Sequence, residues 1–126
     1  MGYRTDRQRV MGLGSAHDGT DHWWSQRLTA IALVPLALLF IFPFAQSLGG
    51  GFEAVRATYA RPFHAIVAIM FLLVAFRHLQ LGVQVVIEDY VSDKPLRTGA
   101  LLANTLFCWA FALTGVFAVA KIAFAA

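Results

Sequence analysis

One histidine stands in the middle of a long apolar stretch. Residues 63–88 are apolar except at a few positions, which are His64, Arg77, His78, Gln80, Gln84 and the terminal Glu88. An ionisable side chain near the centre of a bilayer costs about 2.5–3.5 kcal/mol, so such residues usually face protein and serve a function. A neutral imidazole is a good iron ligand, and haem is the iron cofactor that bundles of membrane helices most often hold this way. His78 is therefore a candidate haem ligand.

The residues around His78 would leave room for a flat group on a helix. Ala75 precedes His78 by three positions and Gly82 follows it by four, so this helical face carries no bulky side chain for a turn on either side. A porphyrin would lie there. A histidine that hydrogen-bonds a neighbouring helix, with the small residues serving helix packing, fits the same spacing. His64 is 14 residues from His78, about 21 Å along a helix, and cannot share its iron.

Two further groups follow near the end of the same stretch. Asp89 comes eleven residues after His78 and returns to almost the same helical face, three turns further along. Tyr90 follows it. A phenol donates one hydrogen bond and a carboxylate can relay a proton, which are the functions needed to hold and protonate a quinone carbonyl. An interfacial tyrosine and an aspartate at a helix end are also ordinary features of membrane proteins.

The composition places these groups in a membrane protein. Of 126 residues, 59% are hydrophobic and only 13% are charged, against about 25% charged in soluble domains. A soluble core of this size could not hide so much apolar surface. The single cysteine, Cys108, excludes an intrachain disulfide and a zinc site built on paired thiolates. The net charge of +3 is too small and scattered for nucleic-acid binding.

The elements that must position the site are three membrane-spanning helices, so the predicted fold is all-α. Residues 1–25 are polar and form a cytoplasmic N-terminal segment, and residues 26–126 form the transmembrane domain. Apolar runs at about 28–48, 63–88 and 99–124 each suffice to cross about 30 Å of hydrocarbon. Pro35 and Pro43 are expected to kink the first span without ending it. A linker at 49–61 and a loop at 89–98 join the spans.

Basic residues near the span ends set the expected orientation, because Lys and Arg resist translocation. With the N-terminus inside, six lie on the cytoplasmic side and three outside: Arg4, Arg7, Arg9, Arg27, Lys94 and Arg97 against Arg56, Arg61 and Lys121. The sequence therefore predicts a cytoplasmic N-terminus and a periplasmic C-terminus. A cleaved signal peptide is the alternative for the first span, but its apolar run is long and starts late, which favours retention.

Two separated segments together resemble one family. The pattern His-x3-Gly-x6-Asp-Tyr, formed by His78, Gly82, Asp89 and Tyr90 and followed by Val91, resembles the haem-binding segment of the hydrophobic membrane anchor subunit of succinate dehydrogenase, respiratory complex II. Residues 14–20 and 22–31, GSAHDGT and HWWSQRLTAI, look like the alphaproteobacterial form. The resemblance runs from about residue 12 to the end, and it is specific because segments some fifty residues apart match together.

The resemblance implies an integral-membrane subunit that packs with a partner anchor subunit around haem b. A flavoprotein subunit would oxidise succinate, an iron–sulfur subunit would carry electrons, and this chain would pair with the cytochrome b anchor subunit in a bacterial inner membrane. His78 matches the axial haem ligand, with the second histidine coming from the cytochrome b partner, and Arg27 matches a haem-propionate partner. Tyr90 matches the tyrosine that binds ubiquinone, and Asp89 its acidic neighbour, with a supporting or proton-relay role.

Arg77 and two alternative functions complete these expectations. Arg77 lies too deep to be unpaired, so we expect it to face a propionate or an acidic group of a partner chain. The chain would catalyse nothing alone. It could instead anchor a quinol:fumarate reductase running in the opposite direction. It could also be a haem-free transporter or assembly module in which His78 and Arg77 form a proton or substrate path.

Overall fold

All regular elements of the described residues are helical. The computed structural model describes residues 5–11 and 18–125. Its elements are α1 (Asp6–Met11), α2 (Asp18–Ser47), the short 3-10 helix η1 (Leu48–Gly50), α3 (Gly51–Tyr59), α4 (Pro62–Tyr90) and α5 (Lys94–Phe124). The all-α prediction is therefore confirmed.

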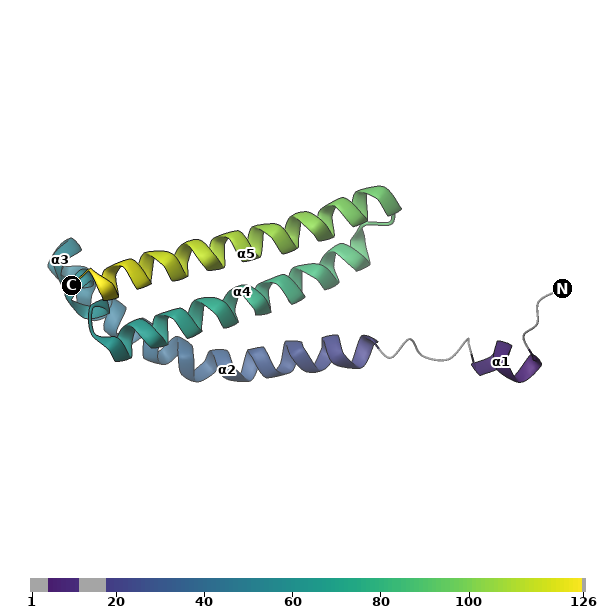
Figure 1. Ribbon diagram of the computed structural model, residues 1–126, viewed down its shortest axis with the longest axis horizontal. Helices are drawn as coiled ribbons and strands as arrows, with labels where there is room; N and C mark the ends of the chain where they lie inside the picture. Colours follow the sequence, from purple (N-terminus) through teal and green to yellow (C-terminus); the bar gives the residue numbers. More distant parts are fainter. Residues whose placement is uncertain (1–4, 12–17, 126) are drawn as a thin grey trace.

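The helix α4 is the central element of the bundle. It packs against α2 on one side and α5 on the other, whereas no Cα atoms of α2 and α5 approach within 8 Å of each other. The start of α2 and the turn between α4 and α5 lie at one end of the molecule, and α3 and the C-terminus lie at the other (Figure 1). The two end regions of the chain thus lie at opposite ends of the bundle.

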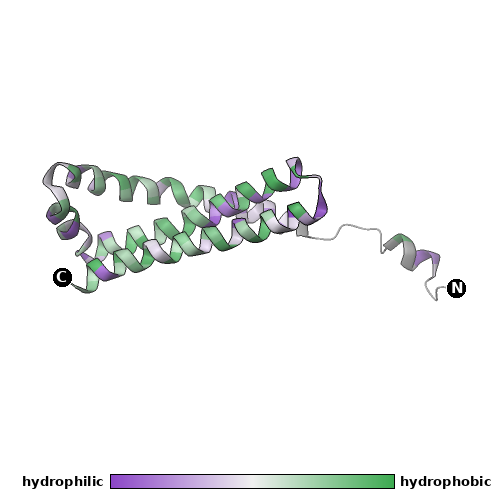
Figure 2. Ribbon diagram, turned by 90° about the horizontal axis from the view of Figure 1, so that it is seen from above, coloured by the Kyte–Doolittle hydropathy of each residue, from purple (hydrophilic) through white to green (hydrophobic). Residues whose placement is uncertain are grey.

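Three helical segments are long and apolar enough to cross a membrane. They comprise residues 20–59, Pro62–Tyr90 and Lys94–Phe124, which confirms the predicted number of spans. Hydrophobic residues run along the three long helices, and hydrophilic ones gather mainly towards their ends (Figure 2). Few side chains are enclosed within the chain itself: Leu81 and Ala112 are each 2% exposed, whereas Leu113 is 58% exposed. A surface of this kind is suited to lipid or to the helices of other subunits.

The helices extend beyond the apolar runs that reveal them. The helix α2 begins at Asp18 and continues through Pro35 and Pro43, so neither proline ends it. The helix α5 begins at Lys94, five residues before the apolar run, because the Asp93 side chain accepts a hydrogen bond from the Leu96 backbone N–H at 2.9 Å. Such a cap satisfies one of the free N–H groups at a helix start. The expected loop at 89–98 thereby shortens to residues 91–93.

The expected linker at 49–61 contains a helix of its own. Gly51, with a φ of 69°, starts α3 in a backbone conformation that suits glycine. The Arg56 guanidinium in α3 donates to the Ala125 carbonyl oxygen at 3.0 Å and so ties α3 to the end of α5. His64 Nδ1 lies 3.2 Å from the Thr58 carbonyl oxygen across the α3–α4 connection. The glycine run concealed this short helix because it breaks the apolar pattern of the first span.

Candidate functional site

The ring of His78 contacts a second membrane span. Its Nδ1 lies 3.0 Å from the hydroxyl oxygen of Thr29 in α2, and the side chain is half-buried. Twelve residues separate His78 from Tyr90 at the end of α4, which is roughly 18 Å along the helix axis. The histidine therefore lies deep in the bundle, where it belongs to α4 and contacts α2.

The other ring nitrogen of His78 is open to the outside of the chain. Among the described residues, Nε2 makes no hydrogen bond, and it is absent from the buried polar atoms without a partner. It is therefore not fully enclosed by this chain. A histidine that only joined two helices and a histidine that also binds a metal would both use Nδ1 in this way, and only the second needs Nε2 free.

A hollow lies one helical turn from His78, between α2 and α4. It has a volume of about 370 Å³, and its lining residues are His22, Trp23, Gln26, Arg27, Gly82 and Val85. Two of its polar atoms, Nε2 of His22 and Oε1 of Gln26, are buried without a hydrogen-bond partner. Buried polar groups are normally paired, so these two atoms are exceptions within the chain, although the chain itself shields both of them.

Gly82 keeps this hollow open beside the histidine. A Cβ atom at Gly82 would lie 3.6 Å from Nε2 of Gln26, an ordinary van der Waals distance. The packing of α2 on α4 therefore does not itself require a glycine here. The hollow therefore has a small residue, Gly82, one helical turn from the imidazole of His78.

Arg27 lines the same hollow from α2. Its side chain is exposed, and its guanidinium carbon lies 5.5 Å from the centre of the Trp23 ring. A cation over an aromatic face is held in place without an ion pair, which leaves its N–H groups free for an anion. The structure thus brings the predicted residues Arg27 and Gly82 together near His78.

Asp89 and Tyr90 lie further along α4 than His78. Both belong to the last turn of α4, and the Tyr90 side chain is 84% exposed. Eleven residues separate Asp89 from His78, or roughly 17 Å along the helix. The structure therefore places this pair away from His78, at the end of the bundle where α2 starts (Figure 1), and Asp89 follows Val85 of the hollow by four residues.

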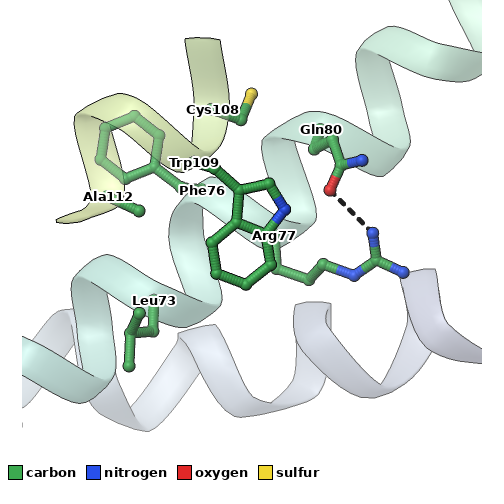
Figure 3. Close-up of a pocket in the computed structure, with 7 residues that line it drawn as sticks. All are labelled: Leu73, Phe76, Arg77, Gln80, Cys108, Trp109 and Ala112. Atoms are coloured by element: carbon green, nitrogen blue, oxygen red, sulfur yellow. Dashed lines mark hydrogen bonds between the residues drawn. The ribbon is translucent and has the colours of Figure 1, made fainter. Parts of the chain in front are cut away.

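Arg77 is hydrogen-bonded to its own helix, beside a pocket that α4 and α5 line together. Its Nη1 donates to Oε1 of Gln80 at 2.7 Å, in a small pocket lined also by Cys108 and Trp109 (Figure 3). Gln80 in turn donates to Thr105 Oγ1 at 3.2 Å. Within this chain the guanidinium is paired with a neutral amide, and its expected acidic or propionate partner is not among the described residues.

Sequence reasoning missed two features of the site. One is the contact of Thr29 with His78, and the other is the polar network that joins α4 to α5, in which Asn104 Nδ2 also donates to the Gln80 carbonyl oxygen at 2.9 Å. The available signal was polarity alone, because Thr29 and Asn104 interrupt apolar runs. Each contact depends on how two helices are set against each other, which spacing within one helix does not give.

The described residues do not form a complete metal site. Among residues 5–11 and 18–125, no three histidine, cysteine, aspartate or glutamate side chains converge on one point. An iron bound to His78 would take its remaining ligands from a porphyrin and from another chain. The donor set of this chain therefore fits one half of a haem site.

The fold and the site define a class: a small membrane protein of three packed spans, with a deep histidine and a hollow that remain open at the surface of the chain. The sequence model of the succinate dehydrogenase/fumarate reductase transmembrane subunits matches residues 1–117. The chain belongs to this family, and within it to the subunits that anchor succinate dehydrogenase in the membrane. These subunits belong to an enzyme complex in which the role of the anchor is not itself catalytic.

Three relatives illustrate this membership. The succinate dehydrogenase hydrophobic membrane anchor subunit of Paracoccus denitrificans is 36% identical over 121 residues, which is 96% of this chain and 93% of that protein. The corresponding subunit of Rickettsia bellii is 32% identical over 83% of this chain and 84% of its own length. The Reclinomonas americana membrane anchor subunit is 33% identical over 63% of this chain and 68% of its own length. No solved structure shows significant similarity to the chain.

Proposed function

We propose that the chain anchors a succinate:quinone oxidoreductase, supplies one axial ligand to haem b and forms part of the site where ubiquinone is reduced. The observation that carries the haem assignment is the arrangement of His78, whose Nδ1 contacts Thr29 while its Nε2 has no hydrogen bond among the described residues, one helical turn from the hollow at Gly82. The relatives named above support the anchor role, because they are anchor subunits of succinate dehydrogenase. This support favours the anchor interpretation over a transporter or assembly module.

The chain's contribution to haem binding is a ligand, a flat space and a cation. His78 would coordinate the iron through Nε2, and the second axial ligand would come from the cytochrome b anchor subunit. Gly82 has no side chain, so a flat ring could lie directly against the surface of α4 at this position. Arg27 would pair with a propionate, since charge-assisted hydrogen bonds to carboxylates are strong. When bound, the haem would supply a one-electron store next to the quinone site.

The quinone assignment rests on the last turn of α4. Tyr90 projects from the helix end with its side chain 84% exposed, so its hydroxyl is free to donate to a carbonyl oxygen of ubiquinone. This hydrogen bond strengthens as reduction places negative charge on that oxygen. Asp89, its neighbour, would relay the proton that the reduced oxygen needs or support the tyrosine.

The proposed partners cover the apolar and polar surfaces that the chain leaves open. The cytochrome b anchor subunit would pack beside α2 and α4 and close the haem hollow. The iron–sulfur subunit would cover the end that carries Tyr90, and the flavoprotein subunit would lie beyond it, where succinate is oxidised. Lipid would contact the remaining exposed apolar side chains of the three spans.

The proposed orientation of the chain in the membrane can be tested with reporter fusions. With the N-terminus cytoplasmic in a bacterial inner membrane, alkaline phosphatase fused after Ala126 should be active and green fluorescent protein at the same site should stay dark. Fusions after Asp93, which follows the second span, should give the reverse pattern. A fluorescent C-terminal fusion would contradict the proposed orientation.

The function itself is tested with the complex purified from cells that do or do not express this chain. With the chain present, the complex should show a b-type band in a reduced-minus-oxidised spectrum and should reduce a ubiquinone analogue with succinate. Without the chain, succinate should still reduce a soluble dye, but not the quinone. Quinone reduction that persists without the chain would refute the proposal. A complex that runs much faster from quinol to fumarate would instead favour the fumarate reductase alternative.

A further inference from the structure

The hydroxyl of Thr29 has three neighbours and one proton to donate. Its Oγ1 lies 2.9 Å from the Ser25 carbonyl oxygen, 3.0 Å from the Gln26 carbonyl oxygen and 3.0 Å from Nδ1 of His78. The two carbonyl oxygens can only accept a hydrogen bond. A threonine inside a helix commonly donates its proton to a carbonyl about one turn earlier. With the proton directed at the backbone of α2, the hydroxyl presents a lone pair to His78.

We propose that Thr29 is a positioning residue, which accepts a hydrogen bond from Nδ1–H of His78 and thereby fixes the ring with Nε2 free and facing out of the chain. A neutral imidazole carries its proton on one nitrogen and its available lone pair on the other. Acceptance at Nδ1 therefore places the metal-binding lone pair on Nε2, the nitrogen that reaches the surface of the chain. This inference rests on the proposed role of His78 as a haem ligand and adds a residue from a different helix.

The expected consequence concerns both the affinity and the electronics of the ligand. Histidines that bind metals usually donate their second N–H to an acceptor, and loss of this acceptor typically weakens metal binding about 10- to 100-fold. An acceptor at Nδ1–H also makes the imidazole more basic, which favours ferric over ferrous iron. Without the Thr29 hydroxyl, haem should be held more weakly and its midpoint potential should rise.

The test uses substitutions at Thr29 in the whole purified complex. Thr29→Val keeps the branched shape but removes the hydroxyl that accepts the hydrogen bond. Thr29→Ala also removes the hydroxyl and leaves a smaller side chain. Thr29→Ser retains the hydroxyl. We expect the valine and alanine variants to lose haem about 10- to 100-fold more readily during purification or challenge with a haem-binding acceptor protein, and to show a shifted b-type band and a raised midpoint potential. Thr29→Ser should resemble the wild type in all these measurements.

A matched control separates this role from helix packing. Thr114 in α5 makes the same bond to its own helix, to the Ala110 carbonyl oxygen at 2.8 Å, and its hydroxyl has no histidine partner among the described residues. Thr114→Val should therefore leave haem content, band and potential unchanged. The inference would be overturned if assembled Thr29→Val or Thr29→Ala complexes kept wild-type haem properties. It would also be overturned if the Thr29→Ser complex lost them. A b-type band that survives His78→Ala would instead overturn the proposed haem role on which the inference rests.

Discussion

Replacing His78 with alanine should abolish the b-type haem band of the assembled complex. The substitution removes the only atom of this chain that we propose to bind iron, and the described residues contain no group of three or more potential metal ligands that could hold the iron in its place. Loss of a direct ligand should exceed the effect of losing an outer partner, which is about 10- to 100-fold in affinity. The measurement is the reduced-minus-oxidised spectrum together with haem content per complex.

His64 provides a matched control on the same helix. It is also half-buried in α4, but its Nδ1 lies 3.2 Å from the Thr58 carbonyl oxygen near the start of the helix. His64→Ala should therefore leave the b-type band intact, although it can loosen the connection between α3 and α4. If His78→Ala retains the band, or if both variants lose it equally, His78 is not the ligand. Amounts of assembled complex, measured by immunoblotting, show whether either variant affects assembly.

Hydropathy could predict the three spans but not their ends. The apolar run that begins at 99 marks the lipid-crossing part of α5, whereas the helix starts at Lys94, where the side chain of Asp93 caps it. A cap is a local hydrogen bond that leaves no trace in hydropathy. The same reasoning applies to α3, where Gly51 with its positive φ allows a short helix that an apolar pattern does not show.

For the candidate site, too, only part of the arrangement could be predicted from the sequence. The spacing of His78 and Gly82 on one helix could be read directly, because residues four apart share a face. The contact of His78 with Thr29 could not, because it joins residues 49 positions apart and depends on how α2 is set against α4. Arg77 illustrates the same limit: its depth could be predicted from the sequence, but its hydrogen bond to Gln80 could not.

Tyr90→Phe should impair electron transfer to quinone while leaving succinate oxidation intact. The substitution removes only the hydroxyl of an exposed side chain in the last turn of α4, so the fold should not change. Loss of a hydrogen bond that stabilises developing charge on oxygen costs about 100-fold or more in rate when the donor is well placed. We therefore expect the succinate-to-ubiquinone rate to fall by about this factor, with little change in the rate with a soluble dye.

The comparison of two acceptors makes this result specific to the membrane end of the electron path. In the proposed complex, succinate oxidation and the iron–sulfur relay would serve both acceptors, so damage to either would lower both rates together. Tyr59 offers the matched control: it is buried at the end of α3, at the opposite end of the bundle, and its hydroxyl has no partner among the described residues. Tyr59→Phe should leave both rates unchanged. Equal losses of dye and quinone reduction in Tyr90→Phe would show that the tyrosine supports assembly and does not act at the quinone, because a local hydrogen bond to the quinone cannot slow a reaction that does not use it.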